Sequence, residues 1–543
     1  MCNLKKILIA AALIIFLSEV LTIELTGQIS DKLPRSIPES EGVSSSGIID
    51  FLNAADTAGR VELHSFMFLR HGKVIAEGWW EPYGPDYKHL LYSASKTFTA
   101  TAIGLALSEN RLRLTDKVFS FFPYSLPDTI SDYMKELTVQ NLLTMSVGQD
   151  PEPRSMGNNG DWINTFLGTE PKHKPGTVFM YNNMATFMLS AIIQQVTGQT
   201  LFEYLKPRLF KPLGISGVDW DLNPQGINLG MIGLRVRSED LAKFGQLLLQ
   251  QGVWNKKQLL PKEWVKEATS FKIDNFNPQG KQTKEKSDWA QGYCYQMWRG
   301  RNNTVRLDGM GGQFVVLIPD KDAVVVLTAN ARDTQDELNL IHNYLIPAIK
   351  SNTALPANHD SYNILQKKQS DLRLKTSVSQ MTKSGFETKI SGKEFVLENN
   401  DYNIQSVYFA FNNDGCSFAL KRDNQISTFK AGSGSWKTTK TSLTSLLAPP
   451  RNISSKSIDA NYSVPQTSVP AAISYSWTDD STLELTARFV EESLGAQTIS
   501  FRFSDINGVV RITIEQSTPA IQLRGPAGAP PRVQIRGTMV DIR

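Results

Sequence analysis

Between residues 47 and 350 the hydrophobic positions alternate between strand-like and helix-like spacing. Two pairs of apolar runs each flank a short turn, at 65–70 with 73–79 and at 314–318 with 323–328. Each pair is typical of a β-hairpin. Apolar residues recur at helical spacing before, between and after these pairs, at 47–52, 93–110, 138–145, 184–198, 241–251 and 336–350. Because no βαβ alternation connects them, we predict an α+β domain, an antiparallel sheet flanked by helices with an all-helical subdomain.

The pattern changes after residue 350. A polar stretch at 351–371 reads as a linker between domains. Short and often alternating apolar runs separated by turn residues follow at 392–397, 406–411, 417–420, 482–489, 499–503 and 509–514. Such runs predict a C-terminal all-β domain, a small barrel or sandwich, over residues 372–543. Within it, the Pro/Gly/Ala-rich segment 525–531 is expected to be poorly ordered.

The first 27 residues read as an export signal. Lys5 and Lys6 precede an unbroken apolar run at 7–17, which is too short to span a bilayer comfortably. No small-x-small cleavage site and no lipobox follow, so an uncleaved membrane anchor is the alternative. We therefore expect an exported protein in the periplasm or cell envelope, which contacts a membrane only if the leader is retained.

Composition narrows the classes of function. The chain is 41% apolar and 20% charged, a normal globular balance. Its net charge is +4 and the basic residues are scattered, which argues against a nucleic-acid surface. Cys294 and Cys416 fall in different predicted domains, so a disulfide between them is not expected. The six histidines are dispersed, and we predict neither a metal site nor a cofactor.

Ser93 and Lys96 stand three residues apart at the start of a predicted helix. At that spacing both side chains project from one face of the first turn. The helix N-terminus favours negative charge on the serine, and the lysine can take or hold its proton. Ser-x-x-Lys alone is a weak pattern. It recurs at Ser427 and Lys430, and an N-cap serine beside a solvated lysine explains an isolated match.

Two later motifs carry groups suited to the same chemistry. Tyr181 and Asn183 are two apart in an extended segment and therefore point to one side. A phenol beside a lysine ammonium is biased toward phenolate, and so toward proton transfer. The Gly-rich stretch 309–313 allows a ligand to approach the backbone, and the N–H of Gln313 could pair with that of Ser93 to hold an oxyanion. Taken singly, each motif is better explained as a buried tyrosine or a strand entry.

A long polar segment at 149–176 lies between these motifs and is rich in Pro, Gly and Asn. A loop of this length inside a compact domain is usually functional or mobile. We expect it to wall a groove over Ser93, with Trp162 as its main large apolar contact. A plain surface loop is the alternative.

The three motifs follow in one order: Ser93-x-x-Lys96, Tyr181-x-Asn183 and then Met310-Gly311-Gly312. In this order they resemble the serine β-lactamase and penicillin-binding-protein superfamily, specifically its class C-like branch of esterases, amidases and acyltransferases. The surroundings are similar to that branch at 69–73, 142–146, 175–183 and 240–245. The resemblance covers residues 33–350 and leaves out the leader and the all-β domain.

The resemblance implies a fold and a set of roles. The fold is an α/β sandwich with an all-helical subdomain and a groove between them. Ser93 would be the acylated nucleophile, with Lys96 and Tyr181 sharing the work of the general base. Asn183 would bind the substrate acyl chain and Lys96. The backbone of Gly312–Gln313 would complete the oxyanion hole with the N–H of Ser93.

One position departs from the family pattern. The third motif usually presents Lys or His where this chain has Met310, and that cation helps to bind the carboxylate of a β-lactam. Methionine cannot do so, and Arg306 is the nearby cation expected to compensate. We therefore predict hydrolysis of a small-molecule ester or amide through an acyl-enzyme in preference to β-lactam hydrolysis.

Other functions are the alternatives to this prediction. The same residues would serve an acyltransferase that passes the acyl group to a small alcohol acceptor. A non-catalytic envelope-binding protein is the alternative from a different class. A Ser-His-Asp hydrolase is disfavoured because the chain has no Gly-x-Ser-x-Gly elbow.

Overall fold

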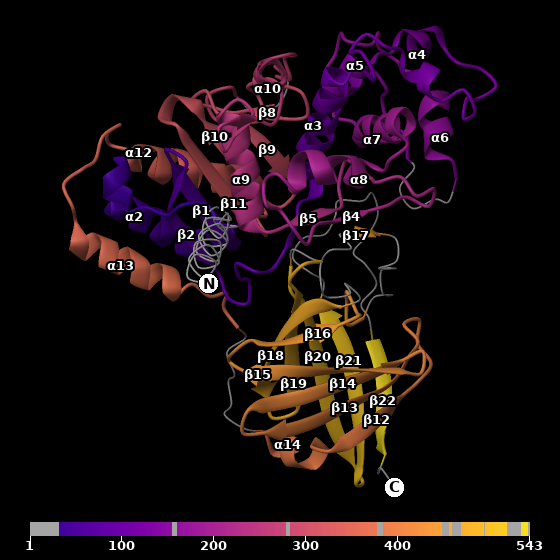
Figure 1. Cartoon of the computed structure of the whole chain (residues 1–543). Helices are drawn as coiled ribbons and strands as arrows, with labels where there is room; N and C mark the ends of the chain where they lie inside the picture. Colours follow the sequence, from indigo (N-terminus) through magenta and orange to yellow (C-terminus); the bar gives the residue numbers. More distant parts are fainter. Residues whose placement is uncertain are drawn as a thin grey trace, which may run out of the picture.

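A six-stranded antiparallel sheet lies at the centre of the N-terminal domain, in the order β2-β1-β11-β10-β9-β8 (Figure 1). Its strands are β1 (Leu63–Arg70), β2 (Lys73–Trp79), β8 (Trp298–Arg299), β9 (Val305–Gly309), β10 (Gln313–Ile318) and β11 (Ala323–Ala329). The structure, a computed structural model, describes residues 32–154, 160–278, 283–376, 384–447, 456–458, 468–492, 495–517 and 534–540. Both predicted hairpins, β1–β2 and β10–β11, are confirmed.

Alternate side chains of the central strands enter two different cores. Met67 and Leu69 of β1 belong to the core shared with the helical subdomain. Phe66 and Phe68 belong to the core on the opposite face. All four are fully buried, and burial of each such side chain stabilises the fold by about 1.5–3 kcal/mol. A sheet covered on both faces explains why its inner strands read as continuous apolar runs.

Helices cover both faces of this sheet. The helices α2 (Ser45–Thr57), α11 (Thr334–Leu340) and α12 (Ile346–Ala348) lie on one face, and α9 (Ser238–Leu249) lies on the other. The helical subdomain contains α3 (Ser95–Ser108), α4 (Asp132–Glu136), α5 (Val139–Leu143), α6 (Trp162–Gly168), α7 (Asn183–Thr197) and α8 (Leu201–Leu205). Gly198, with φ 70°, ends α7 as predicted.

A second sheet, in the order β17-β4-β5-β3, lies beside the helical subdomain. Its strands are β3 (His89–Leu90), β4 (Asp219–Asp221), β5 (Leu234–Val236) and β17 (Lys456–Ile458). The strand β17 comes from the C-terminal part of the chain and pairs with β4. This small sheet therefore joins the two domains.

The predicted linker at 351–371 is wrong in part, because it contains the helix α13 (His359–Ser370). Leu365 is the one buried side chain of this helix and lies in the core beside α2, whereas its neighbour Ile364 is exposed. One buried apolar position left too weak a pattern for prediction. The leader at 1–27 lies outside the described residues. None of the helices in the described part of the chain is long and apolar enough to cross a membrane.

The predicted all-β domain is present as a barrel. Its strands are β12 (Lys393–Leu397), β13 (Ile404–Asn412), β14 (Gly415–Arg422), β15 (Gln425–Ser433), β16 (Lys437–Thr441), β18 (Val469–Asp479), β19 (Thr482–Phe489), β20 (Gln497–Ile506), β21 (Val509–Ser517) and β22 (Gln534–Val540). They form one sheet that closes on itself through the parallel pairing of β15 with β18. Aromatic side chains such as Phe395, Phe409 and Phe501 pack together in its core. In Figure 1 the barrel lies beneath β4 and β5. The segment 525–531 lies outside the described residues.

Candidate active site

Ser93 lies in a tight turn, Tyr92–Ala94, directly before α3. Tyr92 adopts the left-handed conformation with φ 47°, which costs an L-residue roughly 1–2 kcal/mol. The surrounding contacts hold it there: the Ser95 hydroxyl donates to the Tyr92 carbonyl at 2.6 Å, and the Leu91 N–H donates to Leu234 O at 2.9 Å. The sharp turn leaves Ser93 partly exposed at the positive end of α3.

Lys96 is almost fully buried and lies against Ser93. Its Nζ donates to Ser93 Oγ at 2.9 Å, to Asn183 Oδ1 at 2.9 Å and to Met231 O at 3.0 Å. It also lies 4.9 Å from the centre of the Tyr181 ring. The structure thus brings together all four polar residues of the first two motifs around one ammonium group.

The environment sets which of these groups can act as a base. Burial lowers the pKa of Lys96 to about 7, against the opposing effect of the carboxylates of Glu152 and Asp308. Burial raises the pKa of Tyr181, although its contact with Ser93 acts in the other direction. The expected bias of this phenol toward phenolate is therefore wrong, because loss of solvation and the negative charges of Asp308 and Glu152 favour the neutral phenol. Lys96 is the better base near neutral pH.

Glu152 is a site residue that the sequence did not reveal. Its carboxylate accepts from the backbone N–H of Asn183 at 2.5 Å and from Asn183 Nδ2 at 3.1 Å. Because the amide nitrogen of Asn183 faces Glu152, its Oδ1 is left facing Lys96. Glu152 comes from the long segment after α5, which was predicted to wall the groove. No local pattern distinguishes it from other acids in that segment, since the contact is formed only on folding.

The third motif runs alongside the nucleophile turn. A Cβ at Gly309 would come within 2.2 Å of Leu91 O, so only glycine permits this approach. Gly312 has φ 93°, and a side chain there would overlap the carboxyl group of Glu337. The amide side chain of Gln313 points inward, where it donates to Met310 O at 3.1 Å and to Ala329 O at 2.8 Å. The side chain of Gln313 is therefore engaged within the fold, which leaves its backbone as the group that could meet a substrate.

Comparison with known proteins assigns the family. The pattern of the beta-lactamase family matches residues 53–346, more than half of the chain. The chain belongs to the beta-lactamase family.

Individual relatives are distant. The chain is 26% identical over 290 residues to 6-aminohexanoate-dimer hydrolase from Paenarthrobacter ureafaciens, covering 48% of this chain and 71% of that protein. It is 28% identical over 173 residues to protein flp from Staphylococcus aureus (strain MW2), covering 28% of this chain and 34% of that protein, so it spans only about a third of the length of protein flp. Among solved structures, the octameric penicillin-binding protein homologue from Pyrococcus abyssi is 15% identical, with 86% of this chain and 96% of that chain covered and a TM-score of 0.42.

Two residues predicted to meet the substrate are not available to it in this beta-lactamase-family site. Arg306 is 1% exposed and its guanidinium pairs with Asp308 at 2.9 Å, while the carbonyl groups of Asp288 and Arg299 accept its Nη1. It cannot replace the cation missing at the third motif. Trp162 is 4% exposed and packs on Phe187 in the core of the helical subdomain, so it is not the apolar wall of the groove.

Trp298 takes the place expected of Trp162. Its ring stacks on Tyr181, with ring centres 5.8 Å apart and an interplanar angle of 21°. Phe179 contacts it edge-on at 5.6 Å, and Trp298 itself remains half-buried. An aromatic surface therefore adjoins Tyr181. The sequence signal for it was weak, because Trp298 lies in a strand of only two residues.

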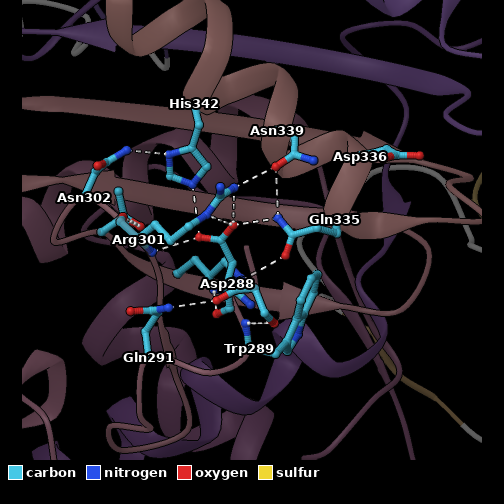
Figure 2. Close-up of polar contacts among 12 residues, drawn as sticks. Asp288, Trp289, Gln291, Arg301, Asn302, Gln335, Asp336, Asn339 and His342 are labelled. Carbon is cyan, nitrogen blue, oxygen red and sulfur yellow. Dashed lines mark hydrogen bonds and ion pairs between the residues drawn. The ribbon is translucent and has the colours of Figure 1, made fainter. Parts of the chain in front are cut away.

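A polar network centred on Asp288 holds the segment before β8 in place (Figure 2). Asp288 accepts from His342 Nε2 at 3.0 Å, from Arg301 at 2.8 Å and from Gln335 Nε2 at 2.7 Å. The other ring nitrogen of His342 contacts Asn302 at 3.0 Å, so this Asp–His pair has no serine partner. Of the residues the structure describes, no group of three or more His, Cys, Asp or Glu side chains could hold a metal ion.

Proposed function

We propose that this protein is a serine hydrolase that cleaves small esters or amides through an acyl-enzyme on Ser93. Ser93 Oγ attacks the carbonyl carbon while its proton passes to the neutral Nζ of Lys96. The backbone N–H groups of Ser93 and Gln313 hold the negative oxygen of the tetrahedral intermediate. Collapse expels the alcohol or amine, which takes a proton from the Lys96 ammonium directly or through the Tyr181 hydroxyl. Water then releases the acid and frees Ser93.

The observation that carries this proposal is the state of Lys96. A buried amine 2.9 Å from Ser93 Oγ, with its pKa lowered to about 7, is a base matched to neutral pH. General-base catalysis of this kind contributes about 10²–10⁴-fold in rate. A structural lysine would instead be paired with a carboxylate, and in the described residues the oxygen atoms that accept from this Nζ are all uncharged.

The charges around the groove favour neutral or cationic substrates over carboxylates. Met310 offers no positive charge, and Arg306 is neutralised by Asp308. With Asp308 paired to Arg306, the remaining charge that acts on Lys96 is that of Glu152, which is negative. A β-lactam, whose carboxylate needs a cation, fits this groove poorly. The relative named as a 6-aminohexanoate-dimer hydrolase supports a small linear amide as the substrate class.

The cellular location forms part of the proposal. The leader pattern at 1–27 supports export to the periplasm or cell envelope. Fusion of these residues to a reporter that is active only outside the cytoplasm tests this, and an inactive but expressed fusion would count against it.

Intact-mass spectrometry after reaction with a fluorophosphonate, and separately with an activated ester, tests the nucleophile. We expect one adduct on the wild type, mapped to Ser93, and none on Ser93→Ala. Ser427→Ala, which removes the serine of the second Ser-x-x-Lys pattern, is the matched control and should label like the wild type. Labelling that persists in Ser93→Ala would overturn the proposal.

A substrate panel then tests the chemistry. We expect turnover of a p-nitrophenyl ester and of an aliphatic amide, and much slower turnover of a penicillin. Equal rates on the penicillin and the ester would contradict the electrostatic argument. The ester assay repeated with an added alcohol distinguishes hydrolysis from acyl transfer, because transfer yields a new ester in place of free acid.

A further inference from the structure

The hairpin formed by β4 and β5 contacts both the nucleophile and its base. On the nucleophile side, Leu234 O accepts from Leu91 N at 2.9 Å and Leu234 N donates to Ser95 Oγ at 3.3 Å, so one residue of β5 holds both flanks of Ser93. On the base side, Met231 O, in the loop of the same hairpin, accepts from Lys96 Nζ at 3.0 Å. A displacement of this hairpin would therefore move Ser93 and Lys96 relative to one another.

The barrel holds the opposite side of the hairpin. Arg235 of β5 is fully buried, and its Nη2 donates to Glu492 Oε2 at 2.9 Å while its Nε donates to Glu491 O at 3.2 Å. Glu491 also accepts from the backbone N–H of Lys88 at 3.1 Å, directly before β3. Glu491 and Glu492 follow β19, so they belong to the barrel. They contact Arg235 of β5 and Lys88, which directly precedes β3, and both strands lie next to the turn that carries Ser93.

Arg235 has partners in its own domain as well. Its Nη1 donates to Asp219 at 3.0 Å and to Asp221 at 2.8 Å, both on β4. Loss of Glu492 therefore leaves the buried guanidinium paired, and the hairpin should still fold. What it loses is one of its contacts with the barrel, because the backbone carbonyl of Glu491 still accepts from Arg235 Nε. The pairing of β17 with β4 provides a second attachment at the far edge of the same sheet.

We propose that Glu491 and Glu492 of the C-terminal barrel are positioning residues for the Ser93–Lys96 centre. They act through Arg235, Lys88 and the β4–β5 hairpin. Neither these two acids nor Arg235 and Lys88 touch the reacting atoms. The barrel would then contribute to the reaction rate at Ser93, in addition to any binding role of its own. This inference rests on the proposed function, because it assigns a role in the reaction at Ser93.

The test compares Glu492→Ala, the double variant Glu491→Ala with Glu492→Ala, and the conservative Glu492→Gln in the full chain. We expect the alanine variants to lower kcat and the rate of fluorophosphonate labelling about 10-fold with KM little changed, since misplacement of reacting groups costs rate more than binding. Glu492→Gln keeps an oxygen acceptor for Arg235 and should recover at least half of the lost rate.

The control is Trp436→Phe, another contact of the barrel with the rest of the chain. Trp436 Nε1 donates to Leu374 O at 3.3 Å, away from the hairpin. We expect it to lower the thermal midpoint without changing kcat. Wild-type kcat and labelling in the double alanine variant, with a lowered midpoint, would overturn the inference and leave the acids as structural contacts.

Ser93→Ala, assayed in parallel, keeps the two failures distinct. If that variant is inactive while the double alanine variant is fully active, only the inference fails. If Ser93→Ala is as active as the wild type, the proposed function fails and the inference with it.

Discussion

Two buried cations of this protein lie in contrasting surroundings. Lys96 and Arg235 are both at most 2% exposed. Lys96 contacts the loop of the β4–β5 hairpin, and Arg235 belongs to β5 itself. Within the described residues Lys96 donates only to uncharged oxygen atoms, and burial lowers its pKa to about 7. Burial would also lower the pKa of Arg235, but three carboxylates outweigh it and raise that pKa above its usual value. Burial alone therefore does not make a group reactive, and the charge of its direct partners decides.

The different partners of these two cations suit them to different roles, one in stability and one in catalysis. A buried cation with full carboxylate pairing keeps its charge at every accessible pH and serves to fix a hairpin. A buried amine without a carboxylate in contact exchanges its proton near neutrality and can act as a base. The predictions below test this division, beginning with the change that should have the largest effect.

Replacement of Lys96 by Met should remove catalysis and spare the fold. The variant keeps the apolar stem but loses the base, so we expect kcat on an activated ester to fall at least about 10³-fold. The matched control is Lys243→Met. Lys243 is also buried, but it donates to Gly214 O at 3.1 Å and lies 3.7 Å from the carboxylate of Asp240.

The control should behave in the opposite way. Loss of Lys243 should lower the free energy of unfolding by about 1–3 kcal/mol, because Asp240 keeps its pair with Arg237 at 3.0 Å, whereas kcat at a temperature well below the unfolding midpoint should stay within about 3-fold. Steady-state kinetics and thermal unfolding of both variants check the pair. If Lys96→Met retained more than about a tenth of kcat, Lys96 would not be the base.

The pH dependence sharpens the comparison at a smaller scale. In the proposed mechanism neutral Lys96 is the active form, so kcat/KM should rise with pH through about 7. The carboxylate of Glu152 favours the ammonium form, so Glu152→Gln should lower this pKa and move the acid limb to lower pH. Glutamine keeps an acceptor for Asn183, so we expect kcat on the plateau to fall only several-fold. A pH profile over about 5 to 9 measures both effects.

Asp161→Asn is the control for that experiment. Asp161 lies in the same long segment and caps α6 through the N–H groups of Ile163 and Asn164, a role that asparagine can keep. Its acid limb should match that of the wild type. A limb that stays in place, or moves upward, in Glu152→Gln would mean that the charge of Glu152 does not control Lys96.

These cases also show how far the sequence could lead. The hairpins, the turn before α3 and the spacing of Ser93 from Lys96 depend on local patterns, and each could be read directly. Arg306 was predicted to bind a substrate carboxylate, but its guanidinium pairs with Asp308, only two residues away. The sequence does not show whether such a cation binds a substrate or a neighbouring acid. Sequence distance does not decide between them.

Longer-range contacts were beyond prediction. Glu152 meets Asn183 across 31 residues, and Trp298 meets Tyr181 across a longer stretch of chain. Neither residue lies in a motif, and each owes its place to elements that pack together only in the folded protein. Arg235 is the extreme case, since its partner Glu492 belongs to a different domain. For such residues the folded neighbour, and not the local pattern, determines the function.

The smallest effect on activity is expected from replacement of Glu337. This buried acid extends the comparison from buried cations to buried carboxyl groups. It is fully buried behind Gly312, and in the described structure neither carboxyl oxygen has a hydrogen-bond partner. Burial raises its pKa well above the usual value, so folding takes up a proton. Between the unfolded and folded pKa values the wild type therefore loses stability as pH rises, by up to about 1.4 kcal/mol per pH unit.

Glu337→Gln removes this cost without a change of volume. Its unfolding free energy should match that of the wild type near pH 4 and exceed it increasingly toward pH 8, with kcat within about 3-fold. Asp288→Asn should show the opposite sign. Burial acts to raise the pKa of Asp288, but its contacts with His342, Gln335 and Arg301 outweigh it and hold the pKa far below normal, so the wild-type carboxylate stabilises the fold above about pH 4 and loses that contribution as pH falls. Denaturant unfolding of the Glu337 variant from about pH 4 to 8, and of the Asp288 variant from about pH 5 down to 2, gives the two slopes. Parallel slopes would mean that partners do not determine the charge of a buried acid here, and the division drawn between Lys96 and Arg235 would fail with them.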